Sequence, residues 1–146
     1  MDFSIQIKET AALTPDELLT ILAARIRVFV VEQACAYQEV DDQDFEARHI
    51  MFYRESKLVA YARIIPHADG QHISFGRVLV VKEYRGQQLG QQLIDTVLAE
   101  IARLFPDQAI KIQAQNYLRD FYGRFGFVAV SDVYLEDGIA HVDMCR

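Results

Sequence analysis

The sequence predicts a mixed α/β fold in which helices flank a central sheet of about seven strands. This prediction follows from the order of apolar patterns along the chain, which is β-α-β-β-β-α-β-α-β-β. The length agrees, since 146 residues suffice for one domain with a sizeable core. The composition, 51% hydrophobic and 25% charged, is typical of globular proteins. We therefore expect residues 1–146 to form a single domain.

The first third of the chain combines one strand, one helix and one long polar stretch. Alternating apolar residues over 3–7 predict the strand. Thr14 and Glu17 have the spacing of a capping box, and apolar residues at helical spacing extend the helix over 15–31. The acidic stretch 32–48 is predicted as a long functional loop that can include a short helix. Asp41, Asp42 and Asp44 are predicted to lie in solvent, with attraction of a cationic amine as the alternative.

The middle of the chain is rich in β-forming residues. Residues 49–54 and 58–65 predict a hairpin, and residues 72–81 a third strand, in which Gly76 indicates a bulge. Apolar residues at helical spacing over 89–105 predict a second long helix.

The last part of the chain alternates short elements. A strand over 110–114 and an aromatic helix over 117–125 precede two strands over 127–135 and 139–144, which an Asp-Gly turn joins. The exposed edges of this hairpin are compatible with a homodimer.

Charge and cysteine content restrict the function classes. With 15 basic and 21 acidic residues the net charge is −6, so we expect neither nucleic acid nor a membrane as a partner. No apolar run approaches the roughly twenty residues of a membrane-spanning helix, and no signal peptide is apparent. Cys35 and Cys145 lack metal-ligand or redox spacing. We therefore expect a reduced, cytoplasmic protein without a metal.

The most informative stretch is residues 78–90, which combines a Val-rich strand, an amide-rich turn and a helix start. The first turn of a helix presents free N–H groups and a positive dipole end. Gly86 lets a phosphate approach the backbone, so the pattern favours an anion such as a pyrophosphate. An ordinary β-to-α turn is the alternative. The stretch matches neither a P-loop nor a Rossmann fingerprint.

Two motifs in this order resemble those of a known family. The turn from Arg85 to Gly90 resembles motif A of the GNAT (Gcn5-related) N-acetyltransferases, and residues 121–127, FYGRFGF, resemble their second motif. The blocks VFVVEQ, DDQD, RH and EDGIAHV resemble the ElaA-like subfamily. The resemblance covers about residues 5–146 and implies the GNAT acyl-CoA N-acyltransferase fold. It also implies transfer of an acetyl group from acetyl-CoA to a primary amine by direct attack in a ternary complex.

The resemblance also implies a site for acetyl-CoA. The backbones of Leu79 and Val80 would line the pantetheine arm, with the Val80 N–H on the thioester oxygen. The pyrophosphate would be held by the turn that consists of Arg85, Gly86, Gln87, Gln88, Leu89, Gly90 and Gln91. Gln88 stands where the family usually has glycine. Gln115 and Asn116 would present an amide to the pantetheine, with the polar cap of the following helix as the alternative.

For catalysis, the resemblance assigns Tyr122 as the general acid that protonates the departing thiolate, against the alternative of a core aromatic. The general base stays open, because the expected strands carry no carboxylate. The candidates are Glu32, His49, His141 and a water chain. Nothing marks Cys35 as a nucleophile.

Two other functions compete with acetyl transfer. One is a non-catalytic acyl-CoA-binding or sensing module on the same fold, and the other is a nucleotide-binding protein that uses the amide-rich turn for ATP. The acceptor, a small molecule or a peptide amine, is not fixed by the sequence. The acidic stretch over 32–46 favours a cationic one.

Overall fold

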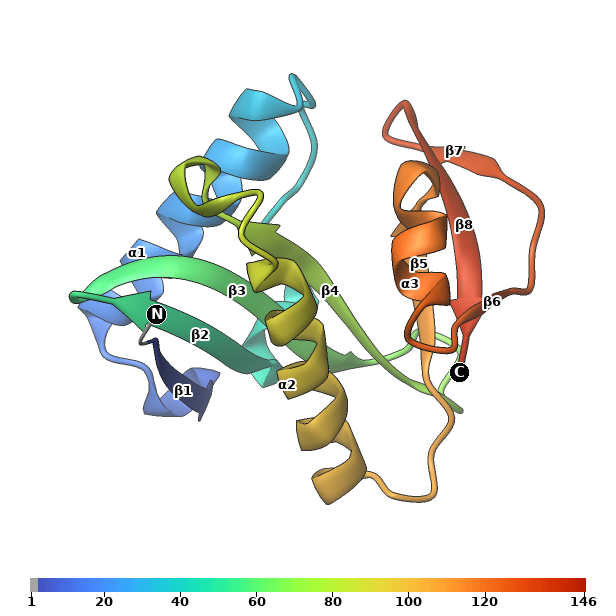
Figure 1. The fold of residues 1–146 in the computed structure, drawn as a ribbon, viewed down its shortest axis with the longest axis horizontal. Helices are drawn as coiled ribbons and strands as arrows, with labels where there is room; N and C mark the ends of the chain where they lie inside the picture. The colour runs from blue at the N-terminus through green and yellow to red at the C-terminus, as the bar shows by residue number, and fades with distance from the viewer. Residues whose placement is uncertain (1–2) are drawn as a thin grey trace.

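The computed structural model describes residues 3–146, which form eight strands in two antiparallel sheets (Figure 1). The first sheet has the order β1-β2-β3-β4 and consists of Ser4–Glu9, Arg48–Arg54, Lys57–Pro66 and Ile73–Val80. The second has the order β5-β8-β6, with β7 also on β8, and consists of Lys111–Gln115, Ile139–Cys145, Val128–Ala129 and Tyr134–Glu136. The predicted fold class is confirmed, with eight strands instead of about seven.

The expected single sheet is divided between β4 and β5, which meet at one end and then diverge (Figure 1). The bridge between Ile73 and Ile110 joins them there. A bulge lies further along β4, because the register shifts between Tyr61 and Arg63 of the neighbouring β3. The left-handed residue of this bulge is Arg77, with φ of 50°, directly after Gly76, where the sequence indicated an irregularity. Bulges bend a strand, which accounts for the divergence.

Helices cover the two faces of the first sheet (Figure 1). On one face α2 (Leu89–Leu104) packs on alternate strand residues such as Ile50 and Phe52. On the other face α1 (Pro15–Ile26) packs on the residues between them, such as Met51. This alternation follows from the period of two along a strand. The short helix α3 (Arg119–Gly123) lies beside the second sheet.

Two predicted elements differ from the structure. The capping box of Thr14 and Glu17 is present, but the α-helix ends at Ile26 and continues as a π-helix over Arg27–Glu32. The predicted strand 127–135 is interrupted between β6 and β7. At this interruption the Asp143 N–H donates to the Ser131 hydroxyl at 2.9 Å instead of to a backbone carbonyl. The row of backbone hydrogen bonds to β8 is therefore broken between β6 and β7. No helix in the described residues is long and apolar enough to cross a membrane.

The acidic stretch forms buried ion pairs, which corrects the prediction of a solvated loop. Arg25 of α1 is fully buried and bonds Glu39 Oε1 at 2.8 Å and both carboxylate oxygens of Asp44 at 2.7 and 3.0 Å. We call these three residues, together with Asp41, Arg63 and Arg77, the arginine network.

The network fixes segment 33–47, which joins the π-helix to β2 and has only one short 3₁₀ helix, Asp42–Glu46. Arg63 of β3 bonds Asp41 at 2.8 and 3.0 Å and Asp44 at 2.8 Å. Burial works against ionisation of Asp44, but its hydrogen bonds from Arg25 hold its pKa well below the usual range. The carboxylates therefore stay charged and paired.

His49 of β2 is buried beside this network. Its Nδ1 is hydrogen-bonded to the Tyr61 hydroxyl at 2.6 Å and its Nε2 to the Thr10 hydroxyl at 2.8 Å. Burial lowers the pKa of His49 to about 4. With both ring nitrogens occupied by structural partners, His49 is not available as a general base.

This buried histidine makes stability depend on pH. Between about pH 6.5 and pH 4 the unfolded chain binds a proton at His49 that the folded protein does not bind, so stability falls as pH falls. At 1.36 kcal/mol per pKa unit the loss attributable to His49 is roughly 3 kcal/mol. Urea unfolding of the wild type and of His49→Asn over this range measures it. The variant should lose less stability on acidification, and identical pH slopes would contradict the assignment.

Candidate active site

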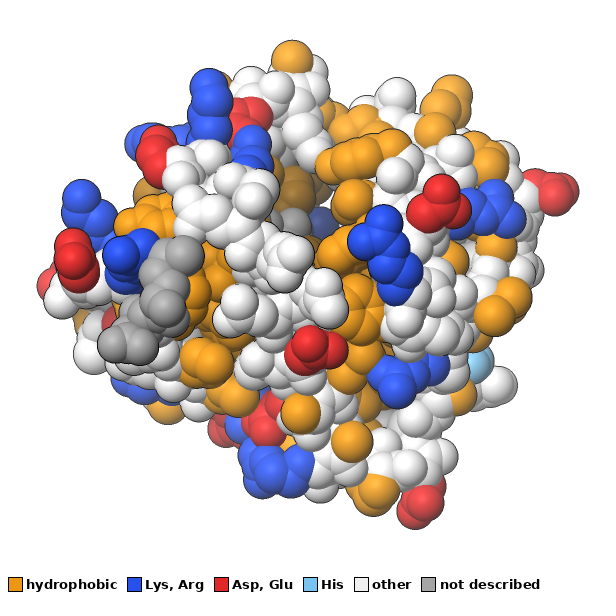
Figure 2. Space-filling view, in the orientation of Figure 1, with side chains coloured by type: hydrophobic (Ala, Val, Ile, Leu, Met, Phe, Trp, Pro, Cys, Tyr) orange, Lys and Arg blue, Asp and Glu red, His pale blue; other side chains and the backbone are white. Residues whose placement is uncertain are grey.

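A cavity of about 700 Å³ lies where β4 and β5 diverge. Its walls come from the π-helix, segment 33–47, β4, β5, α3 and the hairpin of β7 and β8. Figure 2 shows the surface hollowed between the half of the molecule that carries α1 and the half that carries β7 and β8. Seven of the predicted site residues line this cavity: Glu32, Leu79, Val80, Arg85, Gln115, Tyr122 and His141.

The backbone of Val80 faces the cleft. The N–H of its neighbour Val81 donates to the carbonyl of Val59 on β3 at 2.9 Å. Successive residues of an antiparallel strand direct their N–H groups to opposite sides, so Val80 directs its N–H away from β3, toward the open edge of β4. The same alternation turns the N–H of Leu79 toward its register partner Tyr61. Leu79 therefore contributes its side chain to the wall, and Val80 its backbone.

The turn before α2 has the features of an anion site. Gly86 has φ of +80°, and nothing lies within 4 Å of the position that a Cβ would take. Gln88 precedes the helix in the left-handed conformation, with φ of 61° and no side-chain cap. The first-turn N–H groups of Leu89, Gly90 and Gln91 therefore have no acceptors within the helix. The stretch 86–91 lies outside the lining of the cavity.

Arg85 and Glu32 are joined across the rim of the cavity. Arg85 Nη2 donates to Glu32 Oε1 at 2.7 Å, and its Nε donates to the Val80 carbonyl at 2.9 Å. The Glu32 carboxylate therefore holds the Arg85 side chain beside β4. Burial is incomplete here, with 44% of the Arg85 side chain exposed, so a phosphate is able to reach the guanidinium.

Tyr122 of α3 lies in the wall of the cavity within an aromatic cluster. Its ring centroid is 6.1 Å from that of Phe75, 5.1 Å from that of Phe121 and 6.0 Å from that of Phe127. Burial raises the pKa of Tyr122 well above its usual value, so the phenol stays protonated at neutral pH. Both predicted descriptions, a core aromatic and a proton donor, are compatible with this position.

His141 of β8 lines the same cavity from the second sheet. Its Nδ1 lies 2.7 Å from the carbonyl oxygen of Ile139, which only accepts, so Nδ1 carries the hydrogen. The neutral ring then has an unprotonated Nε2. Its ring stacks on Tyr134 at 6.1 Å. Gln115 of β5 is its register partner, so the two side chains lie on one face.

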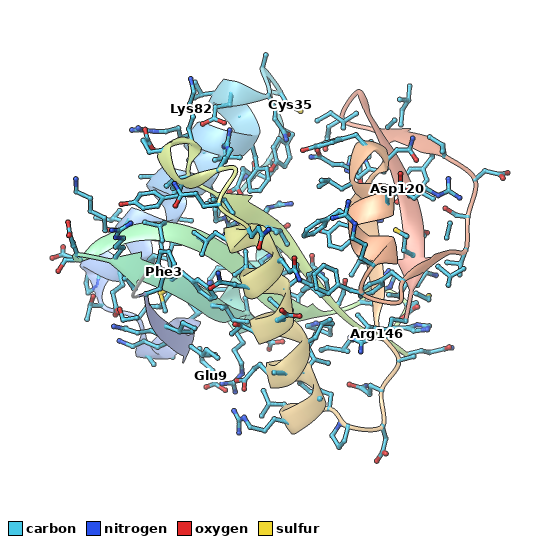
Figure 3. All side chains as sticks on the ribbon, viewed as in Figure 1. Phe3, Glu9, Cys35, Lys82, Asp120 and Arg146 are labelled. Atoms are coloured by element: carbon cyan, nitrogen blue, oxygen red, sulfur yellow. The ribbon has the colours of Figure 1, made fainter. Side chains whose placement is uncertain are left out.

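Two contacts connect segment 33–47 to the second sheet above the cavity. The amides of Gln33 and Gln115 lie 3.4 Å apart, and Cys35 Sγ donates to the Asp137 carbonyl at 3.3 Å. Figure 3 shows Cys35 on the loop that follows the π-helix. Asn116, which follows Gln115, has a buried Oδ1 without a hydrogen-bond partner among the described residues.

Sequence reasoning missed the arginines of the cavity wall. Arg63 and Arg77 line the cavity together with Tyr37. One signal was present, since Arg25 lies one helical turn after Ile21 on the apolar face of α1. A charge there requires buried partners, and the acidic residues 39–44 supply them.

Comparisons with known proteins give one family. The model of the acetyltransferase (GNAT) domain matches residues 10–146. Protein ElaA of Escherichia coli K12 is 42% identical over 137 residues, which are 92% of this chain and 90% of that protein. The crystal structure of an acyl-CoA N-acyltransferase from Pseudomonas aeruginosa superimposes with a TM-score of 0.94 at 42% identity, and that of E. coli ElaA with 0.93 at 38%. Both cover 99% of each chain.

The left-handed Gln88 predicts a stability difference between two glycine variants. Gln88→Gly relieves the steric cost of a positive φ, whereas Gln87→Gly changes a neighbour that is not in this conformation. Both variants raise the conformational entropy of the unfolded chain by the same amount, so this contribution cancels when their stabilities are compared. We expect Gln88→Gly to be more stable than Gln87→Gly by roughly 1–2 kcal/mol in urea unfolding. Equal stabilities would mean that Gln88 is not strained.

Proposed function

The chain belongs to the GNAT acetyltransferase family, and on that premise we propose that it transfers the acetyl group of acetyl-CoA to a primary amine. The observation that carries the proposal is the cleft between β4 and β5, which combines an outward backbone N–H at Val80 with Tyr122 and His141 on its walls. The reaction is direct attack in a ternary complex, without an acyl-enzyme.

Acetyl-CoA would bind along the open edge of β4. The N-terminal turn of α2, with Gly86, Gln87, Gln88, Leu89, Gly90 and Gln91, offers N–H groups to the pyrophosphate. Arg85 offers a partly exposed guanidinium to the same group. Gln115 on the cavity wall supplies an amide partner for the pantetheine. Asn116 lies outside the cavity lining, and its contact with the pantetheine stays a prediction.

The proposed chemistry uses one acid, one base and one backbone donor. His141 Nε2 takes a proton from the ammonium, and the freed nitrogen lone pair attacks the thioester carbonyl carbon. The Val80 N–H stabilises the negative charge that develops on the carbonyl oxygen. When the C–S bond breaks, its electron pair goes to sulfur, and the Tyr122 hydroxyl protonates the thiolate. The nitrogen, which is cationic after its attack, loses its second proton, and this proton restores the Tyr122 phenol. The proton on His141 then passes to solvent as the net product.

His141 is preferred as base over the other candidates for geometric reasons. Glu32 is committed to Arg85, and both ring nitrogens of His49 are committed to structural partners. His141 lines the cavity, its Nδ1 bonds the Ile139 carbonyl, and its Nε2 has no hydrogen-bond partner among residues 3–146. We further propose a cytoplasmic location, since Cys35 and Cys145 are both free thiols. The homodimer stays a prediction.

Calorimetry with acetyl-CoA and a CoA-release assay on an amine panel test the function as a whole. Binding together with amine-dependent release of CoA supports acetyl transfer. Binding without turnover on any amine would favour the sensing module instead. Displacement of CoA by ATP would favour the nucleotide-binding alternative.

Tyr122→Phe removes only the hydroxyl and keeps the aromatic cluster. We expect kcat to fall by about 10²–10⁴ while the Kd of acetyl-CoA stays nearly constant, because the hydroxyl acts as charge develops on sulfur. Tyr53→Phe is the matched control, since Tyr53 is outside the cavity lining. A full rate in Tyr122→Phe with a normal melting temperature would leave Tyr122 a packing residue.

Kinetics distinguish Glu32 from His141 as the general base. His141→Gln should lower kcat by about 10²–10⁴, the range for a positioned base, and should not change acetyl-CoA affinity. Glu32→Gln should instead change the Kd of acetyl-CoA, since it releases Arg85 from its ion pair. Calorimetry measures the Kd of acetyl-CoA in both variants, and steady-state assays measure their kcat. A larger kcat loss in Glu32→Gln than in His141→Gln would reverse the assignment.

A further inference from the structure

Charged side chains of both signs line the cavity. The β4 wall carries Arg77, whose Nη2 donates to the Glu39 carbonyl at 2.8 Å and lies 3.3 Å from Asp41 Oδ2. Its Nη1 has no acceptor among residues 3–146, and the side chain is 20% exposed. The wall formed by β7 and β8 carries Glu136 and Asp137, which are exposed and form no ion pair with the described residues.

Arg77 is held in place before any ligand arrives. Its guanidinium lies 5.3 Å from the centre of the Tyr37 ring, and its backbone is the left-handed residue of the β4 bulge. Non-glycine residues in that conformation cluster at functional sites, where the surrounding structure holds them. Arg25 and Arg63, in contrast, are buried at 0% and 3% exposure and direct their N–H groups to carboxylates. Of the two arginines of the network that line the cavity, Arg77 is the more exposed, at 20% against 3% for Arg63.

The charge balance of the cavity restricts what enters it. The arginine network contains three guanidinium groups and three carboxylates, so it is neutral as a unit. An ammonium has the carboxylates of Glu136 and Asp137 to pair with on the wall formed by β7 and β8, and a carboxylate has the Nη1 of Arg77 to pair with on the β4 wall. A molecule with one ammonium and one carboxylate adds no net charge.

We propose that the acceptor is an amine that also carries a carboxylate, and that Arg77 determines this specificity by binding the carboxylate through Nη1. The amine end then lies toward His141, with Glu136 and Asp137 beside it. This rests on the proposed function. Arg77 and Val80 are three residues apart, roughly 10 Å along a strand, so the two charged groups are separated by several bonds.

The test compares acceptors that differ only in the carboxylate. Purified protein is assayed for CoA release with 4-aminobutanoate, 5-aminopentanoate and 6-aminohexanoate, each against its carboxamide. The amines of each pair have similar basicity, so the comparison isolates the carboxylate. We expect kcat/KM to be higher for the acid by on the order of 10- to 100-fold, the usual effect of a charge-assisted hydrogen bond.

Two variants assign this preference to Arg77. Arg77→Gln should lower kcat/KM for the acid to the level of the amide, mainly through KM, and the loss should be several-fold larger for the acid than for the amide. Arg77→Lys should restore part of the preference. Arg103→Gln is the control, because Arg103 is exposed and pairs with Glu100 at the far end of α2.

The outcomes separate the two proposals. Equal kcat/KM for acid and amide in the wild type overturns the specificity and leaves acetyl transfer standing. An equal loss on acid and amide in Arg77→Gln makes Arg77 a structural residue and also overturns it. No turnover with any amine overturns the proposed function itself. If Arg77→Gln does not fold, the wild-type comparison still decides whether a carboxylate is recognised.

Discussion

The arginine network is the constraint on which the cavity depends, because it shapes the long segment that no sheet supports. Segment 33–47 forms part of the cavity wall, yet it contains only one short 3₁₀ helix. Arg25 of α1, Arg63 of β3 and Arg77 of β4 each bond its carboxylates or carbonyls. Buried ion pairs contribute little net stability, since desolvation offsets their attraction. Their effect here is geometric, because each arginine fixes the segment to a different element.

The bulge in β4 determines the shape of the cleft and also which groups of β4 line it. By bending β4 it separates the two sheets, so that Val80 has no strand partner on its outer side. Arg77 is the left-handed residue of the same bulge and lines the cavity three residues before Val80. In the proposed reaction, the thioester and the carboxylate of the acceptor thus lie along one strand, at residues that are three positions apart. Helix α2 begins at Leu89, after the 3₁₀ helix Lys82–Tyr84 and the turn 85–88, and its first turn returns to β4, since a Cβ on Gly90 would lie 4.0 Å from the Val80 side chain.

Local patterns predicted most of the fold, because helices and strands follow from periodicity. The capping box at Thr14, the irregularity at Gly76 and the turn before α2 were all readable in the sequence. The division into two sheets was not, since it depends on the pairing of β4 with β3. The interruption at Ser131 depends on its hydrogen bond to the neighbouring strand in the same way, and no local pattern marks the change to a π-helix at Arg27. Asp41 and Asp44 were misassigned to solvent, because acidic runs are usually exposed and their partners lie far away in the sequence.

The two sheets touch at one end through Ile73 and Ile110, and this has a consequence for cooperativity. Near the open end, the Gln33–Gln115 and Cys35–Asp137 contacts are peripheral links between the halves. A ligand that fills the cleft contacts both halves and acts as a reversible crosslink between them. By mass action it stabilises only the state in which both sheets are folded. Local opening of the C-terminal half is then coupled to ligand release, so amide hydrogen exchange there reports on occupancy of the cleft.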